Sequence, residues 1–137
     1  MNKALLEMNL RQEEGMRLKP YLDTHGKLTI GVGRNLDDLG INEAEVLYML
    51  NNDMDRCGWE LDRAVDGWRR MNPNRQAALC EMNFQIGLTK LLGFKKMLAA
   101  LHAGDYKTAA DEALNSAWAA QVGDRAKRVA ELIRNPT

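Results

Sequence analysis

The chain has 137 residues, enough for one domain or for two small lobes that share a core, but too few for two separate globular domains. Its 45% hydrophobic and 28% charged residues exclude a disordered, collagenous or disulfide-framework protein. Lysine plus arginine and aspartate plus glutamate number 19 each, so the whole molecule has no net attraction to nucleic acid or to an anionic membrane.

The balanced total conceals an unequal distribution of charge along the chain. Residues 1–60 carry 7 basic and 11 acidic side chains, whereas residues 61–137 carry 12 basic and 8 acidic ones. We therefore expect the N-terminal part to be net negative and the C-terminal part to be net positive.

The first elements are a helix and a β-hairpin. Residues 2–14 follow a helical period and end at Gly15, a residue suited to a left-handed C-terminal cap. After this helix, Arg17–Tyr21 and Lys27–Val32 flank a turn-rich segment and are expected to pair as antiparallel strands. Because Pro20 has no N–H for a strand ladder, the first of these strands should lie at an edge.

The chain beyond the hairpin is expected to be helical. Asn42 and Glu45, three residues apart, form the pattern of a capping box at the start of a helix. Gly58 and Gly67 are expected to bracket a short separate segment around Trp59–Val65.

Four more helices follow in the predicted order. Their ranges are Asn74–Ile86 after Asn72 and Pro73 and closing at Gly87, Phe94–Ala103 before Gly104, a helix from an Asp105 cap through Trp118, and a helix from an Asp124 cap to Asn135 and Pro136. These elements predict a predominantly helical α+β fold in a single domain of residues 1–137. In this fold a small lobe of helix and hairpin, about residues 1–56, packs on a helical lobe of about residues 57–137.

The cysteines and the apolar segments bear on the compartment. Cys57 and Cys80 lie in no CxxC or metal-ligand spacing, so we expect two buried thiols in a reducing compartment. Met1–Leu10 lacks the long apolar run of a signal peptide, and the longest uncharged stretch, Ala113–Gly123, has 11 residues where a membrane helix needs about 20. These features predict a soluble cytoplasmic product.

Three side chains around the hairpin have the spacing of a catalytic group. Glu14 ends the first helix, Asp23 follows nine residues later at the turn, and Thr29 follows six residues after that on the returning strand. Glycosidases of the two-carboxylate kind need one protonated acid for the leaving oxygen and one ionised group that positions water or attacks the anomeric carbon.

The expected surroundings of the two carboxylates assign their roles. Glu14 is followed by the apolar residues Met16 and Leu18, and desolvation by such neighbours would favour its neutral form. Asp23 lies in a polar turn and should stay charged. We therefore predict Glu14 as the acid, while the separation of the two groups, and with it inversion or retention, is left open by the sequence.

The segment from Glu14 to Gly33 resembles the phage-type lysozymes of glycoside hydrolase family 24, typified by the T-even phage enzymes. The spaced pattern E-G-x-R-L-x-x-Y-x-D-T-x-G-x-x-T-I-G-x-G is matched by Glu14, Gly15, Arg17, Leu18, Tyr21, Asp23, Thr24, Gly26, Thr29, Ile30, Gly31 and Gly33. Two later blocks are similar to the family's C-terminal lobe, M-N-F-Q-I-G at Met82–Gly87 and W-x-x-Q-x-x-x-R-A-K-R-V at Trp118–Val129.

The resemblance implies a lysozyme-like fold with a cleft between the lobes. It implies a muramidase that hydrolyses the β-1,4 bond between N-acetylmuramic acid and N-acetylglucosamine, with no cofactor and no metal. Glu14 would be the general acid, Asp23 would position the attacking water, and Thr29 would help to hold that water. The family's usual stereochemical course is inversion.

The resemblance also implies a set of substrate-binding residues. They are Arg34, Phe84, Gln85, Trp118, Gln121 and Arg125. Arg34 stands where a histidine often follows the pattern, so a permanently charged group replaces any histidine–carboxylate pair at this point. Arg125 is expected to approach Glu14 from the basic lobe, which would lower the acid's pKa and oppose desolvation.

The biological setting follows from the same resemblance and from the missing export signal. We expect a monomeric endolysin that is made in the cytoplasm of the host and reaches the peptidoglycan of the cell wall after a holin-type partner has permeabilised the membrane. No nucleic-acid partner and no stable association with a membrane are expected.

Four alternatives stay open at this point. The chain could be a lytic transglycosylase, which uses a single acid and leaves anhydromuramic ends, or a catalytically silent wall-binding or virion module. Asp23 could serve only to form the turn. Thr29 could serve only as a strand residue.

Overall fold

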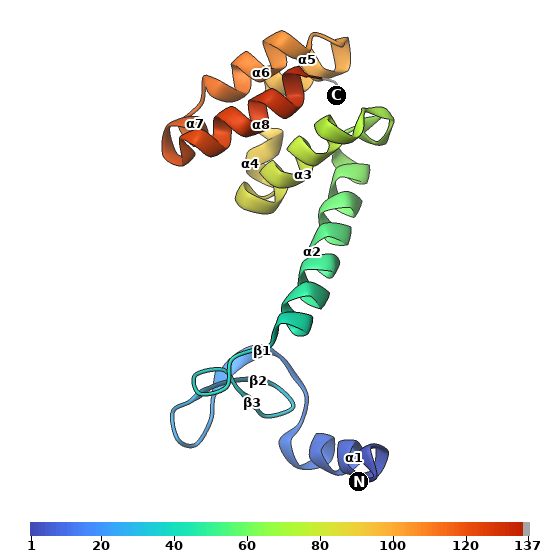
Figure 1. The fold of residues 1–137 in the computed structure, drawn as a ribbon, viewed down its shortest axis with the longest axis vertical. Helices are drawn as coiled ribbons and strands as arrows, with labels where there is room; N and C mark the ends of the chain where they lie inside the picture. Colours follow the sequence, from blue (N-terminus) through green and yellow to red (C-terminus); the bar gives the residue numbers. More distant parts are fainter. Residues whose placement is uncertain (136–137) are drawn as a thin grey trace. The chain divides into compact units, whose positions relative to one another are not determined.

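The computed structural model describes residues 1–135 and divides into two compact units. The first unit is Met1–Tyr48, and the second begins at Met49. The boundary falls inside helix α2, Glu43–Ala64. Figure 1 labels the helices and strands of both units, which are described separately below.

The first unit begins with helix α1, Lys3–Glu14, which matches the predicted helix closely. The side chain of Asn2 caps its start by accepting the N–H of Leu5 at 3.0 Å, which satisfies a donor that the helix leaves free. The helix ends at Gly15, whose φ of +73° suits a glycine and whose N–H donates to the carbonyl of Arg11.

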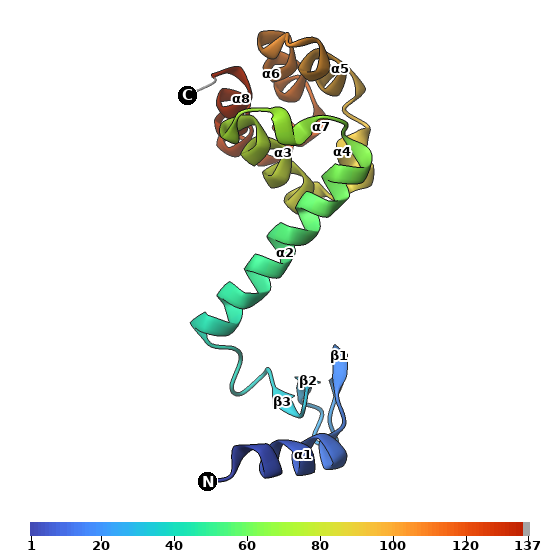
Figure 2. The same cartoon turned by 90° about the vertical axis from the view of Figure 1, so that its right-hand side faces the viewer.

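A three-stranded antiparallel sheet follows α1 and contains the predicted hairpin. Strand β1 is Arg17–Leu22, β2 is Leu28–Gly31, and β3 is Arg34–Asn35, in the order β1-β2-β3 (Figure 2). The edge position predicted from Pro20 is confirmed, and the register of β1 against β2 is irregular between Arg17 and Tyr21. The sequence analysis did not identify β3, because two residues are too few for an alternating pattern.

Helix α2 begins at the predicted capping box. The side chain of Asn42 accepts the N–H of Glu45 at 2.8 Å, and the Glu45 carboxylate accepts the N–H of Asn42 at 3.0 Å. The two bonds satisfy donors at both ends of the first turn, which fixes where the helix starts.

The predicted interruption of this helix at Gly58 is wrong, because α2 continues through it to Ala64. A Cβ on Gly58 would lie 3.1 Å from the guanidinium of Arg69 and 3.8 Å from the ring of Trp68. Arg69 is itself bound through two nitrogens to Asp62 of the same helix. Gly58 therefore provides room for a side chain that packs on the helix, and it does not end the helix.

The second unit is entirely helical in the part that the structure describes. After α2 come the 3-10 helix η1, Trp68–Arg70, and helices α3, Pro73–Ile86, α4, Leu88–Leu92, α5, Lys95–Ala103, α6, Tyr106–Leu114, α7, Ala117–Val122, and α8, Asp124–Arg134. The predicted ends of α3 and α5 are confirmed, and their starts lie within one residue of the prediction, with Asn72 capping α3 and Gly104 ending α5.

Two helix boundaries differ from the prediction. The predicted helix through Trp118 ends at Leu114, because the hydroxyl of Ser116 donates to the carbonyl of Ala113 and accepts the N–H of Ala119, which starts α7. Asp124 is the first residue of α8 and not its cap.

The short helix α4 was not predicted, since five residues carry no clear helical period. The predicted end of the last helix at Asn135 is confirmed, and Pro136 lies outside the described residues.

The two units differ in how they are held together. The largest fully buried side chains of the described residues all belong to the second unit: Leu61, Leu79, Met82, Leu91, Met97, Val129 and Ile133. Helix α8 packs against α3, α6 and α7, and α5 packs against α6. In the first unit Thr29 is the one buried residue, so hydrogen bonds and caps determine its local structure.

The predicted α+β fold with a helical majority is confirmed by these elements. No helix within residues 1–135 combines the length and apolar character needed to cross a membrane.

Candidate active site

Asp23 occupies the turn between β1 and β2. Its Oδ1 accepts the backbone N–H groups of His25 and Lys27, both at 2.8 Å. The hydrogen bond from Lys27 is the main reason that the pKa of Asp23 lies below its ordinary value, since it stabilises the ionised form. Oδ2 accepts no hydrogen bond from any described residue. Asp23 is therefore ionised at neutral pH and has one oxygen available to a ligand.

The backbone of Lys27 connects Asp23 with Thr29. The carbonyl of Lys27 accepts the N–H of Asp23 at 2.9 Å and the hydroxyl of Thr29 at 2.8 Å. Because the hydroxyl proton is used in this bond, Oγ1 of Thr29 can only accept a further hydrogen bond. The turn-forming role of Asp23 and the strand position of Thr29 are thus confirmed, and neither prevents a part in catalysis.

Glu14 lies at the end of α1, where its side chain lies close to the backbone of Gly33. A Cβ placed on Gly33 would be 3.1 Å from Oε2, 3.2 Å from Cδ and 3.3 Å from Cγ of Glu14. The carboxylate is exposed and forms no hydrogen bond or ion pair with residues 1–135. It is therefore open to a ligand.

The predicted apolar packing around Glu14 is wrong. Met16 is 54% exposed and Leu18 is 86% exposed. Leu18 belongs to the edge strand β1, and Met16 is the residue directly before that strand. The desolvation that the sequence predicted for Glu14 therefore does not come from these two residues.

Strand β2 and the turn after it connect the two carboxylates. Glu14 contacts Gly33, two residues beyond the end of β2, while Asp23 is linked through Lys27 to Thr29 within β2. Asp23 is thus held ionised in the turn before β2, and Glu14 lies beside the turn after β2, exposed and without a partner among residues 1–135. Paired carboxylates with different surroundings are the chemical requirement of glycoside hydrolysis.

Arg34 is engaged within the first unit. Its guanidinium donates to the Glu45 carboxylate at 2.9 Å and to the carbonyl of Gly40 at 3.2 Å. This bond, followed by the one from the N–H of Asn42, lowers the pKa of Glu45. The arginine thus connects β3 to the start of α2, and its part in substrate binding stays a prediction.

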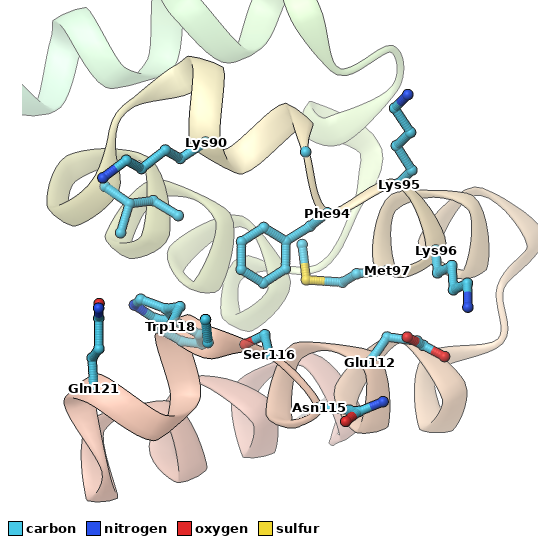
Figure 3. A pocket seen from close by; sticks show the side chains of 13 residues that line it. Lys90, Phe94, Lys95, Lys96, Met97, Glu112, Asn115, Ser116, Trp118 and Gln121 are labelled. Carbon is cyan, nitrogen blue, oxygen red and sulfur yellow. The ribbon is translucent and has the colours of Figure 1, made fainter.

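A pocket in the second unit contains two of the predicted substrate-binding residues, Trp118 and Gln121. Its volume is about 730 Å³, and it opens between the α4–α5 segment and the α6–α7 segment (Figure 3). The indole N–H of Trp118 donates to Oε1 of Gln85 at 3.0 Å, and its ring meets Phe94 edge-on at a centroid distance of 6.1 Å. Trp118 is 6% exposed, so it serves both the core and the pocket wall.

The remaining predicted residues of the second unit lie outside this pocket. Phe84 is 50% exposed on α3, and Arg125 is half-buried on α8. The structure brings Gln85, Trp118 and Gln121 to one region, and the binding roles of Phe84 and Arg125 stay predictions.

Three lysines around the pocket were not identified from the sequence. Lys90, Lys95 and Lys96 contribute to its lining, together with a single carboxylate, that of Glu112. No described carboxylate lies within ion-pair distance of any of the three ammonium groups. The segment K-L-L-G-F-K-K was the available signal, because it places all three next to Phe94.

Two further features of the first unit were also missed. The hydrogen bonds of the Lys27 backbone to Asp23 and Thr29 are seen only in the folded chain. The same holds for the space beside Gly33 that the Glu14 side chain occupies, although Gly33 belongs to the pattern described above. Within the described part of the chain, no three His, Cys, Asp or Glu side chains are grouped so that they could hold a metal ion.

Comparison with known proteins identifies the family. The family model of phage lysozymes matches residues 11–135. A probable T4-type lysozyme of Dictyostelium discoideum is 28% identical to the chain, with all of this chain and 97% of that protein aligned.

Two phage proteins are similar as well. The endolysin of Salmonella phage P22 is 33% identical over 74% of this chain and 73% of its own length. The pre-baseplate central spike protein of Enterobacteria phage T4 is 32% identical over 96% of this chain, which spans only 28% of that protein. With a family model that covers nearly its whole length, the chain belongs to the phage lysozyme family.

Proposed function

We propose that the protein is a glycoside hydrolase that cleaves the β-1,4 bonds between N-acetylmuramic acid and N-acetylglucosamine in peptidoglycan. The observation that carries this proposal is that two carboxylates with different surroundings lie beside the turns before and after β2. Asp23 is held ionised by two backbone N–H groups, and Glu14 is exposed without a protein partner. Membership of the phage lysozyme family supports the substrate class.

In the proposed reaction Glu14 donates a proton to the glycosidic oxygen while that bond breaks. A water molecule attacks the anomeric carbon and transfers its proton to Asp23 through the free oxygen Oδ2. Thr29 can only accept, because its hydroxyl proton is bound to the Lys27 carbonyl. It therefore accepts a hydrogen bond from this water and directs the water's lone pair toward the sugar.

The pocket of the second unit is proposed to bind part of the same polymer. Trp118 supplies an aromatic edge and Gln121 a polar end to a pocket whose three lysines attract anionic groups of the wall. Arg34, Phe84, Gln85 and Arg125 are proposed to take part in substrate binding as well.

The test is digestion of purified peptidoglycan, followed by mass spectrometry of the released ends. Glu14→Gln keeps the shape of the side chain but removes the acid, so hydrolysis should fall by at least about a hundredfold. Glu13→Gln, one residue earlier in the same helix, is the matched control and should cleave like the unaltered protein. Reducing N-acetylmuramic ends are expected, whereas anhydro ends would assign the protein to the lytic transglycosylases.

The proposed setting is that of an endolysin. The protein is a monomer made in the host cytoplasm, and it reaches the wall after a holin-type partner has opened the membrane. The endolysin among the relatives supports this setting.

A second candidate function is that of a lysozyme module of the virion. The similarity to a central spike protein of a phage baseplate favours it, because nearly the whole chain aligns with 28% of that protein. Mass spectrometry of purified virions separates the two settings, since a spike module is found in the particle and an endolysin only in the infected cell.

A further inference from the structure

We propose that Gly33 is a positioning residue for Glu14. The inference rests on the proposed function, in which Glu14 is the general acid. The absence of a side chain at position 33 allows the carboxylate of Glu14 to lie against the backbone after β2, and this contact determines where the acid stands.

The contact is closer than an ordinary side chain would permit. The three nearest heavy atoms to a Cβ at position 33 all belong to Glu14, at 3.1 to 3.3 Å. Real Cβ atoms rarely approach other atoms so closely, so a methyl group at this place would push the carboxylate away by several tenths of an ångström. Proton transfer requires heavy-atom distances of about 2.6–3.2 Å, and a displacement of this size is therefore felt by the reaction.

No other group in the described chain holds the Glu14 carboxylate. It forms no hydrogen bond and no ion pair with residues 1–135, and it is exposed. Helix α1 ends directly after it, at Gly15, so the backbone fixes the start of the side chain but not its end. Gly33 thus leaves room for the reacting oxygens at a place where any larger residue would displace them.

Gly31 provides a control with the same φ and with open space in place of Glu14. Gly31 and Gly33 both have a φ of +69°, a value that residues with a Cβ rarely adopt, so a substitution at either position is strained. A Cβ at Gly31 would have no heavy atom within 4 Å, whereas a Cβ at Gly33 would meet Glu14. Comparing the two positions separates backbone strain from displacement of the acid.

The experiment compares Gly33→Asn with Gly31→Asn, because asparagine tolerates positive φ better than other residues that carry a Cβ. We expect Gly33→Asn to lower kcat on peptidoglycan about tenfold or more, with KM within about twofold. Gly31→Asn should keep both constants within about twofold of the unaltered protein. Equal losses of kcat at the two positions, or no loss at Gly33, would overturn the proposal.

Urea unfolding tests the contact independently of activity. Gly33→Asn should destabilise the protein less in a Glu14→Ala background than in the unaltered one, because the colliding carboxylate is then absent. Gly31→Asn should lower the free energy of unfolding by the same amount in both backgrounds. If Gly33→Asn does not fold, recovery of folding in the Glu14→Ala background shows the same collision.

The outcomes distinguish this inference from the proposed function. If the unaltered protein releases no fragments from peptidoglycan, the proposed function fails, and the unfolding experiment alone decides whether Gly33 restrains Glu14. If the unaltered protein cleaves and the unfolding experiment finds no coupling between positions 14 and 33, the positioning role is wrong and the function stands.

Discussion

At the scale of single residues, the hairpin turn gives Asp23 two tasks on two different oxygens. Oδ1 binds the N–H groups of His25 and Lys27 and forms the turn, while Oδ2 accepts no hydrogen bond from the described residues. The hydrogen bonds that shape the turn are also the reason that the pKa of Asp23 is low. Structure and ionisation therefore have the same cause.

The two tasks can be separated by substitution. In Asp23→Asn the amide oxygen can still accept both N–H groups, so the turn should keep its shape, and the melting temperature at neutral pH should fall only by the stabilisation that the lost charge provided. We expect kcat on peptidoglycan to fall about a hundredfold or more. Asp23→Ala should lose activity and also lower the melting temperature, because both hydrogen bonds are removed. A normal kcat for Asp23→Asn would contradict the role proposed for the carboxylate.

The pH dependence of stability provides a second measurement for the same residue. The pKa of Asp23 is lowered in the folded state, so its charge stabilises the protein at pH values above the unfolded pKa, near 3.8. This contribution is lost as the pH falls through the folded pKa. When the pH is lowered and unfolding is followed by circular dichroism, the free energy of unfolding should therefore decrease less steeply with falling pH for Asp23→Asn than for the unaltered protein.

At the scale of elements, α4, α5 and α7 form a pocket with positive charge. Lys90, Lys95 and Lys96 come from α4 and the start of α5, and Trp118 comes from α7 (Figure 3). The three ammonium groups pair with no carboxylate of the described chain. Their charge is thus available to anionic groups of a substrate, although the whole protein is neutral.

Charge reversal tests the contribution of this pocket. Lys95→Glu with Lys96→Glu should raise KM for peptidoglycan several-fold, about five- to tenfold at low salt, and the difference should shrink as salt screens the charges. The control is Lys107→Glu with Lys127→Glu, which changes the net charge equally at exposed positions outside this pocket. An equal rise in KM for both pairs of substitutions would mean that the net charge of the protein, and not the charge at the pocket, sets its affinity for peptidoglycan.

At the scale of the whole molecule, the two units differ in their interiors. Apolar side chains of α3, α5 and α8, among them Leu79, Met97 and Ile133, are fully buried in the second unit. Among residues 1–48 burial is limited to Thr29. Buried apolar contacts set the free energy of local opening, so the first unit should open more readily.

Hydrogen exchange measures this difference directly. The amides of β2, Leu28–Gly31, should exchange faster than those of α3 around Leu79 and Met82, by a factor of about ten or more, since their opening costs less free energy. Both segments form backbone hydrogen bonds, so the comparison is matched in that respect. Equal protection of the two segments would contradict the expectation.

Local signals were sufficient for much of the fold. The cap at Asn42 with Glu45, the proline start of α3 and the glycine ends of α1 and α5 were predicted correctly, because each depends on hydrogen bonds within a few residues. The residues of the candidate site were chosen in the same way, from the spacing of Glu14, Asp23 and Thr29.

Close contacts and exposure depend on residues far apart in the sequence, and they could be seen only in the tertiary structure. Gly58 lies inside a helix and leaves room for Arg69, and Gly33 meets Glu14 because the turn after β2 returns to the end of α1. The same dependence on distant residues explains why the predicted apolar cover of Glu14 is absent and why the lysines gather around one pocket. A sequence encodes local hydrogen bonds through near neighbours, whereas close packing and exposure are set by residues that only folding brings together.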